Sequence, residues 1–98
     1  MKTSLEVIYN IYKDKLDSFK LQQIEDYIDA ELIKERPTNA HLYYEWQIPI
    51  TFSDFGLTTE DGMRHLKYLA HKYRTLGKFS RASTWYTFDN NAEICLEA

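Results

Sequence analysis

The residues best suited to chemistry are six Lys and Arg side chains gathered in residues 62–88, GMRHLKYLAHKYRTLGKFSRASTWYTF. This segment contains no Asp or Glu, although the chain of 98 residues carries a formal net charge of −3. Duplex DNA is a rod of closely spaced negative charge, and each phosphate neutralised by Lys or Arg releases counterions. A cation-rich segment without acids is what a protein needs in order to bind such a polyanion.

Other kinds of chemistry find little support in the sequence. The three histidines and Cys95 do not have the spacing of zinc ligands, and the three glycines form no Gly-rich phosphate loop. No pair of acids is marked out for general acid–base catalysis. We therefore predict a non-enzymatic protein that uses no metal and no cofactor.

Length and composition indicate one globular domain with a modest core. The chain is 44% hydrophobic and 28% charged, and no apolar run is long enough to span a membrane. The N-terminus does not have the pattern of a secretory signal. Cys95 is the only cysteine and cannot form an internal disulfide, which fits a cytoplasmic protein, and we expect it to be a small apolar residue.

The N-terminal half is expected to be helical. Residues 4–15 place apolar side chains at helical spacing after Ser4, which can cap the first turn. A stronger pattern begins at Asp17 or Ser18 and stops before Pro37. Its apolar face carries Leu21, Ile24, Tyr27, Ile28 and Leu32, and its opposite face carries Gln22, Glu25, Asp26, Asp29 and Glu35. Residues 37–46 suggest one further short helix.

The middle of the chain changes character. Residues 47–52, QIPITF, alternate apolar and polar side chains and predict an extended segment, and Pro49 favours a sheet edge or a short connection. Residues 53–57 have room for a single helical turn, which Gly56 would close.

A second long helix should follow, starting at Thr58 or Thr59 and running to Tyr73. The early acids Glu60 and Asp61 suit a helix N-terminus. Its predicted core face carries Met63, Leu66, Leu69, Ala70 and Tyr73. The far side carries Arg64, Tyr68 and His71, flanked by Lys67 and Lys72. The outer face is therefore expected to be basic and aromatic.

After Gly77 the sequence indicates a β-hairpin. Residues 78–88 contain two β-rich runs around a polar tip at residues 80–83, with Lys78 and Arg81 at its edge and tip. Residues 92–98 fit either a last strand or a turn of helix.

This order of elements in residues 50–88, ITFSDFGLTTEDGMRHLKYLAHKYRTLGKFSRASTWYTF, resembles a winged helix-turn-helix DNA-binding domain. In that family a brief second helix ends near a glycine, a recognition helix follows, and a two-stranded wing comes next. The resemblance implies that these three parts are residues 53–56, 58–73 and 76–88. The second helix is very short, and the link RTLGK is longer than the usual glycine turn.

Charge and resemblance together predict an α+β domain, with helices in residues 1–47 and a winged-helix part in residues 48–98. It would bind duplex DNA as a transcriptional or replication regulator. Arg64 would contact guanine, the cations further along the helix would meet phosphates, and Lys78 and Arg81 on the wing would reach the backbone or minor groove. The predicted DNA-binding residues are Thr59, Arg64, His65, Lys67, Tyr68, His71, Lys72, Lys78 and Arg81.

A second hypothesis is a protein-binding adaptor or inhibitor, because a winged-helix scaffold also serves protein recognition. Small, aromatic-rich domains with an acidic face are common products of phages and other mobile elements. The working surface would then be the acidic helix face of residues 22–35 or the tyrosines Tyr43, Tyr44 and Tyr68. A third possibility combines the two, with a DNA-binding half and an N-terminal half for dimerisation. A homodimer through the N-terminal helices would then read paired DNA half-sites.

Overall fold

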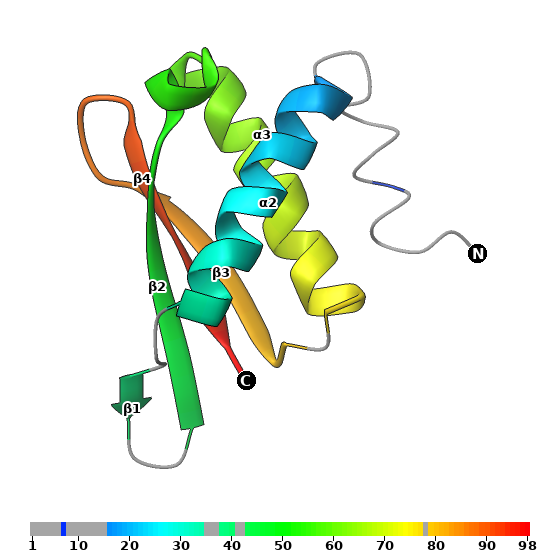
Figure 1. Ribbon diagram of the computed structural model, residues 1–98, viewed down its shortest axis with the longest axis vertical. Coiled ribbons are helices and arrows are strands. Elements are labelled where there is room, and N and C mark those ends of the chain that lie inside the picture. The colour runs from blue at the N-terminus through cyan, green and yellow to red at the C-terminus, as the bar shows by residue number, and fades with distance from the viewer. Residues whose placement is uncertain (1–6, 8–15, 35–37, 41–42, 78) are drawn as a thin grey trace.

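The structure is a computed structural model that describes residues 7, 16–34, 38–40, 43–77 and 79–98 (Figure 1). In these residues the fold is mixed α+β, as predicted. The helices are α2 (Ser18–Lys34), the 3-10 helix η2 (Phe52–Phe55) and α3 (Thr59–Thr75). The strands are β1 (Thr38–Ala40), β2 (Tyr43–Thr51), β3 (Arg81–Tyr86) and β4 (Asn91–Glu97). Apart from residue 7, the predicted helix of residues 4–15 lies outside the described residues, and so does the predicted contact Lys78.

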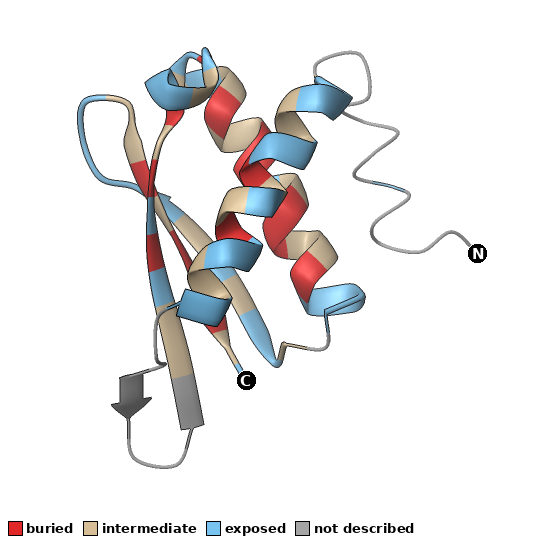
Figure 2. Ribbon diagram, in the orientation of Figure 1, coloured by how far each residue is buried: buried red, intermediate tan, exposed pale blue. Residues whose placement is uncertain are grey.

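The four strands form one antiparallel sheet in the order β1-β2-β4-β3. Side chains alternate between the two faces of a strand, so the register places one row of each strand toward the helices. This inner face carries the apolar side chains of β2 and β4, namely Trp46, Ile48, Ile50, Ala92, Ile94 and Leu96. The two helices cover that face, and the buried residues meet between helices and sheet (Figure 2).

The predicted apolar stripes of both helices are confirmed. Ile24 and Ile28 of α2 and Leu66 of α3 are fully buried in the shared core. Gly62 of α3 lies so close to the ring of Phe52 in η2 that a β-carbon there would overlap it. The short η2 is therefore held directly against the start of α3.

The helix ends are set by capping residues and a glycine that the sequence predicts. Oδ1 of Asp17 accepts hydrogen bonds from the backbone N–H groups of Phe19 and Lys20, which starts α2. Thr58 caps α3, because its Oγ1 accepts a hydrogen bond from the N–H of Asp61 at 3.2 Å. Gly56 ends η2 in the left-handed conformation, with φ of 69°, as the single-turn prediction required.

The prediction of a short helix in residues 37–46 is wrong. Residues 38–40 and 43–46 are strand, so the helical part described by the structure ends at Lys34 and not at residue 47. The deciding contact is non-local, since Trp46 and Ile48 pair with Leu96 and Ile94 of β4, about half the chain away. The extended segment around Pro49 is confirmed. Because β1 pairs only with residues 43–45, the one described strand beside Pro49 is β4.

The predicted tip of the hairpin is also wrong. Residues 81–83 lie inside β3, and the turn falls at residues 87–90 between β3 and β4. Asp89 and Asn90 take left-handed backbone conformations there, with φ of 48° and 66°, which Asp and Asn tolerate better than most residues. The C-terminal segment is accordingly a strand and not a turn of helix, and Arg81 stands at the start of β3 instead of at a tip.

Candidate functional site

The cationic side chains of α3 do not form one surface. Lys67 and Arg74 are exposed, and neither forms an ion pair with a described residue. They lie seven positions apart, two helical turns, and His71 between them completes a stripe on the outer side of the helix. This stripe occupies the C-terminal half of α3, whereas a recognition helix contacts bases with its N-terminal residues.

Arg64, the predicted guanine contact, forms ion pairs with two acids of its own helix. Its guanidinium forms ion pairs with Glu60 and, at 2.5 Å, with Asp61, and its side chain is only 20% exposed. Both acids are one turn earlier, at i−4 and i−3, the spacing at which helical side chains meet. A guanine contact would therefore have to displace two carboxylates that themselves repel phosphate.

His65 is not a surface residue, so its assignment as a DNA contact is wrong. It is 1% exposed, and its ring joins the two helices. Nδ1 lies 2.6 Å from the carbonyl oxygen of Asp61, and Nε2 accepts a hydrogen bond from the backbone N–H of Asp17 at 2.9 Å. A neutral ring with its proton on Nδ1 makes both bonds.

The predicted phosphate contact Lys72 faces α2. Its ammonium forms an ion pair with Glu25 at 2.6 Å, and the pair is largely covered. One turn after Glu25 on α2, the carboxylate of Asp29 accepts a hydrogen bond from the hydroxyl of Tyr73 at 2.5 Å. Two acids of the predicted acidic helix face therefore contact α3 and join the two helices.

Tyr68 and His71 are both half-buried, and Tyr68 packs against the core cluster. Burial, followed by the nearby Arg74 guanidinium, lowers the pKa of His71. The ring therefore favours its neutral form near pH 7 and adds no cation to the stripe. Its Nε2 is buried without a hydrogen-bond partner among the described residues.

Thr59 and Arg81 also depart from the predicted contact surface. The Thr59 hydroxyl donates to the side chain of Asn90, which fastens the start of α3 to the hairpin turn. Arg81 belongs to the row of β3 that points away from the helices, opposite Glu97, whose carboxylate lies 4.0 Å from its Nε. Arg81 and the α3 stripe therefore point to opposite sides of the sheet.

Acids gather where η2, the start of α3 and the hairpin turn come together, at the end of the molecule drawn at the top of Figure 1. We call this the acidic end, and its members are Asp54, Glu60, Asp61 and Asp89. Asp54, Glu60 and Asp89 are exposed, and Asp61 is half-exposed. Arg64 is paired within this group, and the ammonium of nearby Lys20 donates to the carbonyl of Gly56. At this end of the molecule the described residues thus supply four carboxylates and two cations.

The sequence does not predict the acidic end, because its members come from three separate segments of the chain. Asp54, Glu60 and Asp89 come to the same end of the molecule only once the hairpin turn folds beside η2, where the N–H of Phe52 donates to the carbonyl of Asn90 at 2.9 Å. One local pattern does indicate the ion pairs of Arg64, because Arg64 follows Glu60 and Asp61 by four and three positions in a predicted helix.

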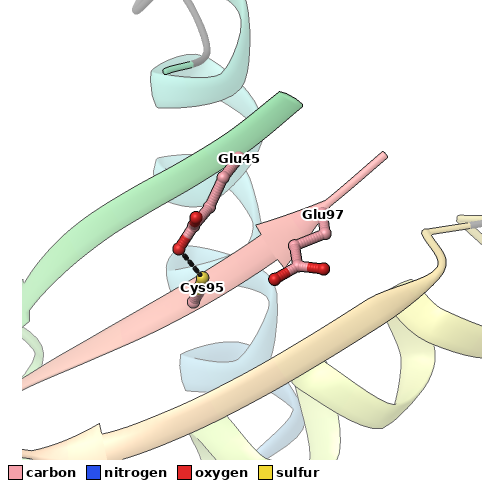
Figure 3. A group of neighbouring side chains, drawn as sticks. All are labelled: Glu45, Cys95 and Glu97. Carbon is pink, nitrogen blue, oxygen red and sulfur yellow. Dashed lines mark hydrogen bonds between the residues drawn. The ribbon is translucent and has the colours of Figure 1, made fainter. Parts of the chain in front are cut away.

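The outer face of the sheet has a second acidic group around Cys95 (Figure 3). The buried thiol donates to Glu45 at 2.7 Å, and Glu97 points toward the same place, with the three ligand atoms within 4.8 Å of one another. Burial, and then the Glu45 carboxylate, raise the pKa of the Cys95 thiol to about 12. The thiol is therefore a protonated donor near neutral pH, and its hydrogen bond to Glu45 goes beyond the small apolar residue expected from the sequence. A metal ion would have to displace this proton.

The chain stands apart in all three comparisons with known proteins. No protein-family model, no curated protein and no solved structure matches it. Its function must therefore be argued from its own geometry and charge.

Proposed function

We propose that the chain is a winged-helix domain that binds a protein with a basic surface, as a non-enzymatic adaptor or inhibitor. The order of elements supports the winged-helix arrangement. The brief η2 ends at Gly56, the long helix α3 follows, and β3 and β4 form a two-stranded hairpin after it. These are the three parts that the family resemblance implies, with the wing shifted to residues 81–97.

The negative charge of the acidic end is the reason why we propose a protein partner and not DNA. In a winged helix the start of the recognition helix and the nearby wing face the nucleic acid. Here those positions hold Glu60, Asp61 and Asp89, with Asp54 beside them. Carboxylates at the docking surface repel phosphates and suit Lys and Arg of a protein partner.

Exposed aromatic residues strengthen this proposal. On the same hairpin, Tyr86 is 51% exposed and Phe88 is 65% exposed. Large rings bordered by charges are typical of the few residues that carry most of the free energy of a protein–protein interface. The acidic end and these two rings together form the binding surface of the proposal.

A charge-reversal experiment tests this account of the surface. The double variant Asp54→Lys, Glu60→Lys should gain affinity for random-sequence duplex DNA in a gel-shift series, because only the acids keep phosphate away. The matched control Asp26→Lys, Glu31→Lys adds the same charge on α2 and should gain less than half as much binding free energy. Equal gains in the two variants would contradict the claim that the acidic end keeps DNA away from this surface.

Duplex DNA binding as a regulator is the second candidate, and one observation favours it. Lys67 and Arg74 are exposed, unpaired with any described acid, and two turns apart on one side of α3. Two free cations support phosphate contacts without base reading. If this candidate holds, Lys67→Glu with Arg74→Glu abolishes a salt-dependent gel shift by the wild-type chain, and sequence preference is weak.

A homodimer through the N-terminal helices remains part of this second candidate. The apolar stripe that suggested it, including Ile24 and Ile28, is buried inside the chain. On α2, the exposed large apolar side chains left for such a dimer are those of Phe19 and Ile33, which are 70% and 88% exposed.

A further inference from the structure

Strand β3 is an open edge of the sheet. It pairs with β4 along one side, and none of the described residues pairs with its other side. Open edges are commonly protected by proline, a bulge or several charges. The six residues of β3 contain no proline, keep an unbroken register with β4 and carry one charge, that of Arg81. This edge is therefore available for pairing with another strand.

The inner face of β3 leaves room for a further strand beside it. Ala82 and Thr84 point toward the helices but are only half-buried, and Tyr86 in the same row is exposed. If α3 extended well past the edge, it would cover these three side chains. The helix layer therefore leaves the edge uncovered along β3.

We propose that β3 pairs with β3 of a second copy of this chain, antiparallel and with Ser83 on the two-fold axis. Antiparallel self-pairing about such an axis is the simplest closed arrangement for two identical edges. It places Arg81 of each copy directly opposite Trp85 of the other, both on the outer face. The result is a continuous eight-stranded sheet made from two four-stranded ones.

Charge complementarity selects a second copy as the occupant. The indole Nε1 of Trp85 donates to the carboxylate of Glu93 at 3.1 Å, so each Trp85 has an acid beside it. Arg81 of the other copy then meets an aromatic ring and a carboxylate together. Within its own chain the Arg81 side chain is 80% exposed, and its one ion-pair partner among the described residues is Glu97, at 4.0 Å. Symmetry provides this complementary pair twice.

The outer face itself disfavours a different dimer, in which two sheets stack face to face. Among the described residues, that face carries Glu45, Glu93 and Glu97 around Cys95, against the single cation Arg81. Stacking would bring like charges together in a poorly solvated layer. Edge pairing keeps these acids in solvent and brings only the Arg81 ends of β3 to the acids of the other copy.

Sedimentation equilibrium of the full chain without nucleic acid, from about 1 µM to about 500 µM, tests the proposal. We expect a reversible dimer, weakened at least about tenfold in Arg81→Glu. The matched control Lys34→Glu makes the same charge change at the end of α2 and should leave the dissociation constant within about twofold. A wild-type chain that stays monomeric throughout, or two variants with the same dissociation constant, overturns the proposal.

Cross-linking provides a second readout that does not depend on the charge variant. Ser83 lies opposite Cys95 within the chain, so the native thiol is first removed by Cys95→Ser. In that background Ser83→Cys should form an intermolecular disulfide rapidly, because the two cysteines face each other across the axis. Gln47→Cys, on β2 of the same face, is the control. Equal cross-linking rates for the two variants contradict pairing through β3.

Discussion

The side chain of His65 accepts a hydrogen bond from the backbone N–H of Asp17, 48 positions earlier, at 2.9 Å. The same ring bonds to the carbonyl of Asp61 inside α3, and it is fully enclosed. One imidazole therefore fixes where the first turn of α2 meets the first turn of α3. Its role is structural, although its position in a cation-rich segment suggested a contact with DNA.

Replacing His65 should destabilise the fold. We expect His65→Ala to lower the free energy of unfolding by about 2–4 kcal/mol, because it leaves a cavity and an unpaired N–H on Asp17. Urea unfolding followed by circular dichroism measures this. Lys67→Ala, two positions later on the exposed side, should change stability by less than about 0.5 kcal/mol. Equal losses in the two variants would contradict the role of the ring.

Gly62 should tolerate no side chain while Phe52 is in place. A β-carbon at residue 62 overlaps the buried ring of Phe52, so Gly62→Ala should cost about 1–3 kcal/mol of stability despite the better helix propensity of alanine. The second change Phe52→Ala removes the overlapping atoms, which are Cγ and both Cδ atoms of the ring. Thermal unfolding should show that Gly62→Ala is less harmful in the Phe52→Ala background than in the wild type. A stabilised Gly62→Ala single variant would contradict the close packing of η2 on α3.

Stability should fall at alkaline pH because of Cys95. The pKa of the Cys95 thiol is raised to about 12 in the folded chain, whereas the thiol of the unfolded chain has a pKa near 9.0. Between these values the unfolded chain has lost the proton and the folded chain retains it, so rising pH favours unfolding. Urea unfolding at pH 8 and at about pH 10.5 should show a loss of stability that is smaller in Cys95→Ala. An identical loss in both proteins would assign it to other groups.

The Glu45 carboxylate should also control the reactivity of this thiol. Glu45→Gln removes one cause of the raised pKa of Cys95 and should increase the rate of alkylation by iodoacetamide at a fixed alkaline pH. Glu31→Gln on α2 is the control for a lost acid elsewhere. The reverse order of rates would show that the hydrogen bond from Sγ to Glu45 does not protect the thiol.

Local signals in the sequence were sufficient to predict both described helices. The apolar rhythm of α2 and α3, the capping residues Asp17 and Thr58, and the left-handed Gly56 each act over a few positions. The strand β2 could not be predicted in full because its pairing with β4 is non-local, joining for example Trp46 to Leu96. The hairpin turn was misplaced because the polar residues 80–83 outweighed Asp89 and Asn90, whose tolerance of positive φ marks the true turn.

The candidate site was harder to predict than the fold. The sequence shows a segment without acids, but acids from outside that segment pair with its cations. Lys72 meets Glu25 from α2, and Arg81 lies near Glu97 from β4. His65 is enclosed when the chain around Asp17 folds over it. Counting charges along the chain cannot detect such pairs, because they form only between elements packed in three dimensions.

We propose that the acidic end directs the chain toward a protein partner and away from DNA. The most direct measurement is the fluorescence anisotropy of a labelled random duplex titrated with the wild-type chain at about 50 mM and about 200 mM salt. The account predicts no saturable binding at either salt concentration. Saturable binding that weakens steeply with salt, and that is lost in Lys67→Glu with Arg74→Glu, would contradict it and establish DNA as the ligand.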